Sequence, residues 1–149
     1  MEFEQLKLSN QLCFPIYAAS RLITREYQPY LDELGITYPQ YLVLMVLWEN
    51  DGISVNEISN KLILNTNTIT PLLKRMESQG LIHRQRSDSD ERKVIVDLTE
   101  KGKLMQENAA RIPEKLATEL ISGDVKVEEL IELKSKLESI IAFLVKKQD

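Results

Sequence analysis

Two helix-start signatures in close succession, followed by two short β-type runs, constrain the fold of this chain more than any other feature. The four residues from Ser54 form a Ser-x-x-Glu capping box, and the polar segment 65–68 offers a second helix start. Gly80 is placed to end the second helix, and the apolar-polar runs 81–86 and 93–98 flank a fully polar hinge. Helix, turn, helix and charged-tipped hairpin predict a winged helix-turn-helix.

Helical periodicity accounts for most of the remaining chain. A long helix is expected over residues 9–34, with its regular part beginning around 12–14 so that Pro15 falls in the first turn, and with a bend or break at Pro29. Pro71 favours a late start for the second helix of the motif. Further helices are expected over 39–49, 54–62, 99–120 with a kink at Pro113, and 127–145. The predicted fold class is therefore α+β, mostly α, in a single domain spanning 1–149.

Composition argues against several function classes. The only cysteine, Cys13, cannot form an intrachain disulfide, and with a lone His83 it makes a thiolate or imidazole metal site improbable, so no cofactor is expected. No apolar run is long enough to span a membrane, and a cytoplasmic location is expected. Although the net charge is −4, residues 61–99 carry seven basic and five acidic side chains. This modest signal for nucleic-acid binding is one that a solvated mixed-charge face would also give.

Short hydrogen-bonding side chains gather at the start of the second helix of the motif. A recognition helix inserts its N-terminal residues into the major groove, and basic side chains further along it reach the phosphates. The plain alternative is an ordinary polar face with capping residues, because threonine and asparagine are common helix caps. The candidate DNA-binding residues of this helix are Asn65, Thr66, Asn67, Thr68, Thr70, Lys74 and Arg75.

The hairpin strengthens the DNA-binding hypothesis. Arginines at the tip of a β-ribbon suit the narrow, electronegative minor groove, and Arg92 is the best candidate, with Asp90 placed to hold its guanidinium. The alternative is a solvated turn whose charges have no role. The candidate DNA-binding residues of the hairpin are Arg84, Arg86, Asp90 and Arg92. Helix and hairpin together favour DNA binding.

Several motifs resemble those of one family. The run 73–82, Leu-Lys-Arg-Met-Glu-Ser-Gln-Gly-Leu-Ile, followed by Asp-Glu-Arg at 90–92, resembles the MarR family of winged-helix regulators. Segments 10–14, 17–21 and 31–42 are similar to the organic-hydroperoxide-sensing, one-cysteine branch of that family. The resemblance covers nearly the whole chain.

The resemblance implies a DNA-binding transcriptional regulator, expected to be a repressor, that releases its operator when its cysteine is oxidised. It implies a homodimer on a pseudo-palindromic double-stranded operator. Residues 1–36 and 99–149 would supply the dimerisation helices, and residues 37–98 the winged helix-turn-helix region.

The resemblance also implies a redox site, in which tyrosines donate hydrogen bonds to a reactive cysteine. The residues that match this site are Cys13, Tyr17, Tyr27 and Tyr38. Helix N-terminal amides and phenol donors favour the thiolate, which is the nucleophilic form. The plain alternatives are a small buried hydrophobe for the cysteine and core packing for the tyrosines. Without a second cysteine, a sulfenic acid would be capped by a low-molecular-weight thiol as a mixed disulfide.

The chain departs from this branch at two places. Residues 64–71 read Leu-Asn-Thr-Asn-Thr-Ile-Thr-Pro, where the branch commonly has Leu-Asp-Ser-Gly-Thr-Leu-Thr-Pro, so the operator sequence does not carry over. Pro15 stands where alanine is common.

Two other functions are compatible with parts of this pattern. One keeps the DNA binding but makes the signal a small aromatic or lipophilic ligand, with Cys13 inert. The other is a thiol peroxidase, which the lack of a resolving cysteine disfavours, so the chain is predicted not to be an enzyme.

Overall fold

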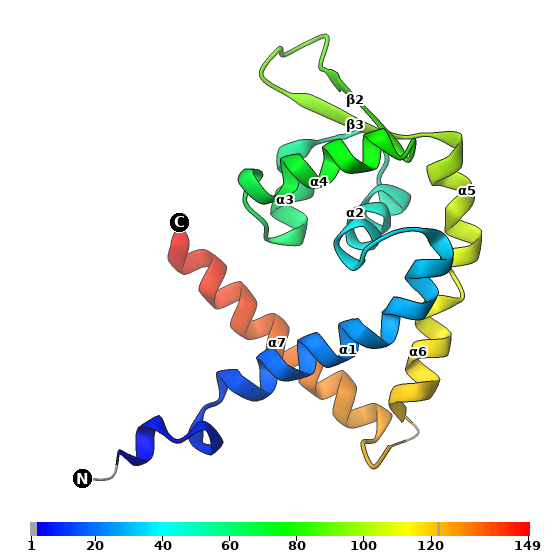
Figure 1. Ribbon diagram of the computed structural model, residues 1–149. Coiled ribbons are helices and arrows are strands. Elements are labelled where there is room, and N and C mark those ends of the chain that lie inside the picture. Colours follow the sequence, from blue (N-terminus) through cyan, green and yellow to red (C-terminus); the bar gives the residue numbers. More distant parts are fainter. Residues whose placement is uncertain (1–2, 122) are drawn as a thin grey trace. The chain divides into compact units, whose positions relative to one another are not determined.

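The computed structural model describes residues 3–121 and 123–149, which divide into one compact unit ending at Ile112 and a second beginning at Pro113. Helices make up most of both units (Figure 1). After two single 3₁₀ turns, η1 (Glu4–Leu6) and η2 (Leu8–Asn10), the first unit contains α1 (Cys13–Leu34), α2 (Tyr38–Glu49), β1 (Ile53–Ser54), α3 (Val55–Leu62), α4 (Thr66–Ser78), β2 (Ile82–Arg86), β3 (Val94–Leu98) and α5 (Glu100–Ala109).

Helix α1 begins at Cys13 and ends at Leu34, and its C-cap, Gly35, adopts a left-handed conformation with φ 69°. The predicted start was therefore confirmed, with Pro15 in the first turn. Of the predicted bend or break at Pro29, the break is absent, because the helix continues through this residue. Leu31 is fully buried just after it, and this packing holds the last turn in helical form despite the lost backbone hydrogen bond.

Helix α2 forms the centre of the core. The capping box between Thr37 and Gln40 is present, and it fixes the helix start as the sequence predicted. Six of the twelve residues of α2 are buried, in agreement with a helix that is apolar on nearly every side; Met45, at 36% exposed, is an exception. Side chains from α1, α3, α4 and the sheet complete the same cluster.

The helix-turn-helix is built by two caps. Ser54 and its capping box start α3, and Ile63, with φ 55°, turns the chain toward α4. Asn65 starts α4 by accepting the backbone N–H of Thr68 at 3.0 Å. The cap fixes an early start and places Pro71 inside the helix, so the expectation that Pro71 favours a later start was wrong.

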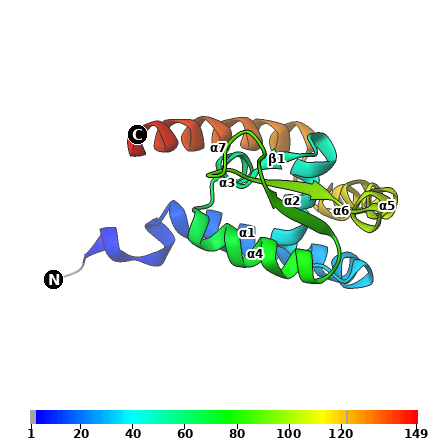
Figure 2. The same ribbon diagram turned by 90° about the horizontal axis from the view of Figure 1, so that it is seen from above.

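A small antiparallel sheet has the strand order β1-β3-β2. Its β2–β3 hairpin, labelled in Figure 1, forms the wing, and Figure 2 labels β1. The two predicted strands are present, and Arg84 of β2 lies opposite the fully buried Val96 of β3. The sequence did not reveal β1, because two residues are too short to show a period. It pairs Ile53 with Val96 and so ties the start of α3 to the sheet.

The predicted helix over 99–120 is two helices in the structure. Helix α5 ends at Ala109 and α6 (Ile112–Ile121) begins three residues later. The expected kink is a break because Pro113 cannot continue α5, whereas its missing N–H costs nothing in the first turn of α6. The last helix, α7 (Val127–Gln148), starts as predicted and runs three residues past the predicted end. None of the helices in the described residues is long and apolar enough to cross a membrane.

Candidate nucleic-acid interface and redox site

Helix α4 has one buried face and one exposed face. The predicted inward stripe is buried as expected and consists of Ile69, Leu72, Leu73 and Met76. The exposed side chains on the other face are Thr66, Asn67, Thr68, Lys74 and Arg75, and Thr70 is half-buried. The helix therefore presents its polar N-terminal turn and two basic side chains to solvent, which is the arrangement that major-groove recognition requires.

The N-terminal end of α4 already contains an internal contact. The side-chain oxygen of Asn65 accepts both the backbone N–H of Thr68 and its hydroxyl, the latter at 3.2 Å. These two residues therefore order the helix start. Thr66 and Asn67 lie between them, are exposed, and make no side-chain hydrogen bond within the described part of the chain. They are the side chains most available for base edges.

The tip of the wing is closed by its own hydrogen bonds. Ser87 donates its N–H to the carbonyl of Lys93 at 2.8 Å, and Lys93 donates in turn to the carbonyl of Asp90 at 3.0 Å. The carboxylate of Asp90 accepts the backbone N–H of Arg92 at 3.0 Å. Asp90 was expected to hold the guanidinium of Arg92, but in this structure it orders the backbone below that side chain. Arg86 and Arg92 are both exposed.

Arg84, also predicted to contact DNA, is held by the recognition helix. Its guanidinium forms an ion pair with Glu77 of α4 at 3.1 Å, and its backbone N–H donates to the same carboxylate at 2.9 Å. These hydrogen bonds from Arg84 keep the pKa of Glu77 below its ordinary value. The Arg84 side chain is 21% exposed, and its Nε is buried without a hydrogen-bond partner. Arg84 therefore links the wing to α4.

Cys13 is exposed and is the first residue of α1. No side chain caps this helix, since Leu12 at the N-cap position makes no such hydrogen bond. The first-turn amides of α1, next to Cys13, are therefore not occupied by a capping side chain. Pro15, the third residue of the helix, supplies no N–H to this set.

The tyrosines gather at the other end of α1. Tyr27 of α1 packs against Tyr38 of α2, with ring centroids 5.0 Å apart, and against Tyr41 at 5.8 Å. Burial raises the pKa of Tyr27 and of Tyr38, with the neighbouring Tyr38 adding to the effect on Tyr27, so these phenols remain hydrogen-bond donors. The structure thus brings together two of the predicted tyrosines, and it adds Tyr41, which the sequence had indicated only as a core residue.

Within one chain, however, the cysteine and this tyrosine cluster are not neighbours. Cys13 and Tyr27 are fourteen residues apart on the same helix, which corresponds to about 21 Å. Tyr17 lies one turn from Cys13 and is exposed, with the guanidinium of Arg21 4.7 Å from its ring centroid. Any contact between Cys13 and the Tyr27 cluster therefore requires a second copy of the chain.

Helix α4 has one buried apolar face and one exposed polar face, and it is joined to a wing with basic side chains at its tip. This combination defines the winged helix-turn-helix DNA-binding proteins. Residues 25–108 match the family model described as transcriptional regulator SarA/Rot. The chain belongs to this family, the MarR/SarA-type winged-helix transcriptional regulators, as its motifs had indicated.

Two transcriptional regulators are similar to this protein over almost the whole chain. The organic hydroperoxide resistance transcriptional regulator of Bacillus subtilis is 48% identical over 98% of this chain and 97% of its own length. The HTH-type transcriptional regulator MgrA of Staphylococcus aureus is 37% identical over 90% of this chain and 92% of its own.

Solved structures agree with this assignment. The structure of reduced AbfR bound to DNA is 39% identical, covers 97% of this chain and 99% of that one, and has a TM-score of 0.77. The structure of a cysteine-to-serine mutant of MarR from E. coli with operator DNA covers 94% of this chain and 99% of that one, with a TM-score of 0.82. At 24% identity it supports the fold alone.

Proposed function

We propose that this protein is a DNA-binding transcriptional regulator, acting as a repressor, that senses organic hydroperoxides through oxidation of Cys13 and then releases its operator. The observation that carries this proposal is an exposed cysteine at the uncapped start of a helix. It occurs in a chain that is 48% identical to a regulator of organic hydroperoxide resistance. The exposed face of α4 and the tip of the wing would make the DNA contacts.

The functional unit would be a homodimer. Helix α1 exposes the apolar side chains of Ile16, Leu22 and Ile23, and Leu12 just before it is exposed as well. Helix α7 exposes Leu133, Ile140, Ile141 and Leu144. Exposed apolar surface of this kind favours association with a second copy. Residues 1–36 and 99–149 would supply this interface, with 37–98 as the DNA-binding region. Pairing would also allow Tyr27 and Tyr38 of one protomer to approach the cysteine of the other.

The chemistry at Cys13 would proceed in two steps, oxidation by the hydroperoxide and capping by a thiol. The thiolate attacks one oxygen of the hydroperoxide, so that an S–O bond forms, the O–O bond breaks, and the alcohol leaves after taking up a proton. A low-molecular-weight thiol then attacks the sulfenic sulfur, and a mixed disulfide forms with loss of water. The sequence contains no second cysteine that could take the place of this thiol.

Oxidation would weaken DNA binding through geometry. The capped side chain is bulkier and no longer accepts a hydrogen bond as an anion, so it would separate Tyr27 and Tyr38 from Cys13. The helices that carry the two wings would then shift relative to each other. Because both half-sites of a palindromic operator must be contacted at a fixed spacing, a small shift lowers affinity.

The test combines mass spectrometry of Cys13 with a DNA-binding assay on one sample. The protein is treated with limiting cumene hydroperoxide and free cysteine, and the DNA is a duplex that the reduced protein selects from a random library. We expect the mixed disulfide to appear in step with DNA release, and Cys13→Ser to remain bound. Release by Cys13→Ser, or binding by fully modified wild-type protein, would contradict the proposal and favour a ligand-responsive regulator with an inert cysteine.

A further inference from the structure

Gln40 is a buried polar side chain that bridges two helices. It is the third residue of α2 and is 3% exposed. Its Oε1 accepts the backbone N–H of Thr37 at 3.0 Å, which completes the capping box. Its Nε2 donates to Oε1 of Gln79 at 3.0 Å. Since an amide has one accepting and one donating end, the capping box dictates that the donor faces Gln79.

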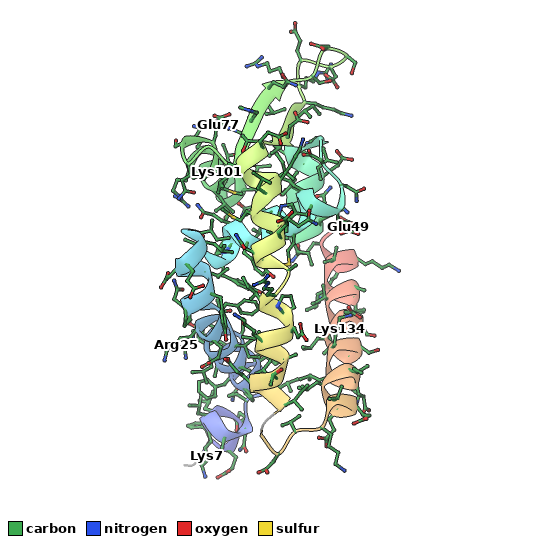
Figure 3. All side chains as sticks on the ribbon, turned by 90° about the vertical axis from the view of Figure 1, so that its right-hand side faces the viewer. Lys7, Arg25, Glu49, Glu77, Lys101 and Lys134 are labelled. Carbon is green, nitrogen blue, oxygen red and sulfur yellow. The ribbon has the colours of Figure 1, made fainter. Side chains whose placement is uncertain are left out.

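Gln79 is the C-cap of the recognition helix α4, and this end of α4 is held from two sides. Lys101 of α5 donates its ammonium group to the backbone carbonyl of Gln79 at 2.9 Å, and Thr99 donates to the carbonyl of Gly80 at 2.6 Å. Figure 3 labels Lys101 on α5 and Glu77 in the last turn of α4. Helix α5 therefore holds the backbone at this end, and α2 holds the Gln79 side chain.

The other side of Gln40 leads to the tyrosine cluster. Tyr38 and Tyr41 lie two residues before and one residue after Gln40, and both rings pack on Tyr27 of α1. Tyr41 also makes an edge contact with Trp48, whose indole N–H donates to the carbonyl of Gly102 in α5. Because Tyr38 and Gln40 both lie in the first turn of α2, a displacement of this turn away from Tyr27 would carry Gln40 with it.

The Gln40–Gln79 hydrogen bond is suited to transmitting this movement. Breaking it would leave a buried N–H without a partner, which is unfavourable, so α4 is expected to follow α2. Helix α4 is a single helix of thirteen residues, and a displacement of its C-terminal end is carried to the DNA-facing end at Thr66.

We propose that Gln40 is a positioning residue that couples the tyrosine cluster to the recognition helix through its hydrogen bond to Gln79. This inference rests on the proposed function and adds a route by which oxidation of Cys13 alters DNA affinity. Such a route is established by measured coupling and not by position alone.

The test therefore changes Gln79, which is exposed, and leaves the buried Gln40 and its capping box intact. Gln79→Met keeps the length of the side chain but removes the acceptor, and Gln79→Ala is a second variant that removes it by truncation. Gln79→Glu retains an oxygen for Gln40 and serves as the rescue. Ser78→Ala is the matched control, since it removes an exposed hydrogen bond internal to the same end of α4.

The measured quantity is the ratio of operator Kd between protein oxidised with cumene hydroperoxide plus free cysteine and reduced protein, on a duplex selected from a random library. We expect Gln79→Met and Gln79→Ala to lower this ratio about three- to tenfold, and Gln79→Glu and Ser78→Ala to keep it near the wild-type value. The rate of Cys13 oxidation should be the same in every variant.

A purely structural role for the hydrogen bond would weaken DNA binding equally in both states and leave the ratio unchanged, and this result would overturn the inference. The ratio measured for the wild type distinguishes a failure of the proposed function from a failure of the inference. A wild-type ratio near one would contradict the proposed function and the inference with it. If the wild type shows a ratio well above one, and Gln79→Met and Gln79→Ala show the same ratio, only the inference is overturned.

Discussion

Arg84 in the wing strand β2 is bonded twice to Glu77 in the recognition helix, through its guanidinium and through its backbone N–H. The two elements that would enter the two grooves of DNA are thereby joined by a pair of side chains within one chain. This pairing gives Arg84 a role in orienting the wing, whether or not it also reaches a phosphate.

We expect Glu77→Gln to weaken operator binding and to change how stability depends on pH. Hydrogen bonds from Arg84 lower the folded-state pKa of Glu77. The ionised Glu77 therefore stabilises the folded protein above pH 4.5, the ordinary pKa of this group, and this stabilisation is lost as the pH falls through the lowered pKa. Urea unfolding between pH 3 and pH 7 measures this. Glu77→Gln should reduce the loss of stability on the acid side. An unchanged pH profile would show that the ion pair adds nothing to stability.

Arg92→Ala should weaken operator binding by about 1–3 kcal/mol, which is typical for the loss of a good groove contact. The side chain is exposed at the wing tip, above a backbone ordered by Asp90, so its removal should not disturb the fold. Fluorescence anisotropy at matched salt concentration measures the effect. Gln85→Ala, which truncates an exposed side chain of the wing strand β2 to which no DNA contact is assigned, is the control and should leave affinity unchanged. Equal affinity of both variants would contradict the role given to the wing.

Tyr27→Phe and Tyr38→Phe should each slow the oxidation of Cys13 while leaving DNA binding by the reduced protein intact. Their rings would still pack in the cluster, but one phenol donor to the thiolate would be lost. The rate is measured by mass spectrometry after limiting cumene hydroperoxide. Tyr30→Phe, on α1 near the same cluster, is the control. If both variants were oxidised at the wild-type rate, the tyrosines would be structural only.

The caps explain which parts of this fold were predictable. Ser54, Thr37 and Asn65 each satisfy local backbone donors, so they fixed helix starts that could be recognised from a few neighbouring residues. Pro71 did not delay the start of α4 because the Asn65 cap outweighed this local preference. The helix continues through Pro29 because the burial of Leu31 holds its last turn.

The candidate site, too, could be predicted from the sequence only in part. The polar face of α4 follows from helical period alone, since it lies opposite four buried side chains. The hydrogen bond between Gln40 and Gln79 joins residues 39 positions apart, so no local sequence pattern predicts it. The separation of Cys13 from Tyr27 became evident only when both were placed on one helix.

Gly102→Ala should lower the stability of the fold by about 1–3 kcal/mol. A Cβ at this position would lie 2.3 Å from the backbone carbonyl oxygen of Leu81, which cannot move aside as a flexible side chain would. Glycine therefore allows α5 to pack closely against the base of the wing, where its carbonyl also accepts the Trp48 indole N–H. Urea unfolding measures the loss. Gly123→Ala is the control, because its nearest neighbour would lie at an ordinary 3.9 Å. Equal stability of the two variants would contradict this account.

Pro15→Ala should increase the rate of Cys13 oxidation about two- to fivefold. Alanine would restore an N–H in the first turn of α1, where no side chain competes for the amides, and an added donor favours the thiolate. The rate is measured by mass spectrometry after limiting cumene hydroperoxide, at the same pH for both proteins. Operator binding by the reduced variant checks that the fold is intact. A rate at or below that of the wild type would show that the first-turn amides do not act on Cys13.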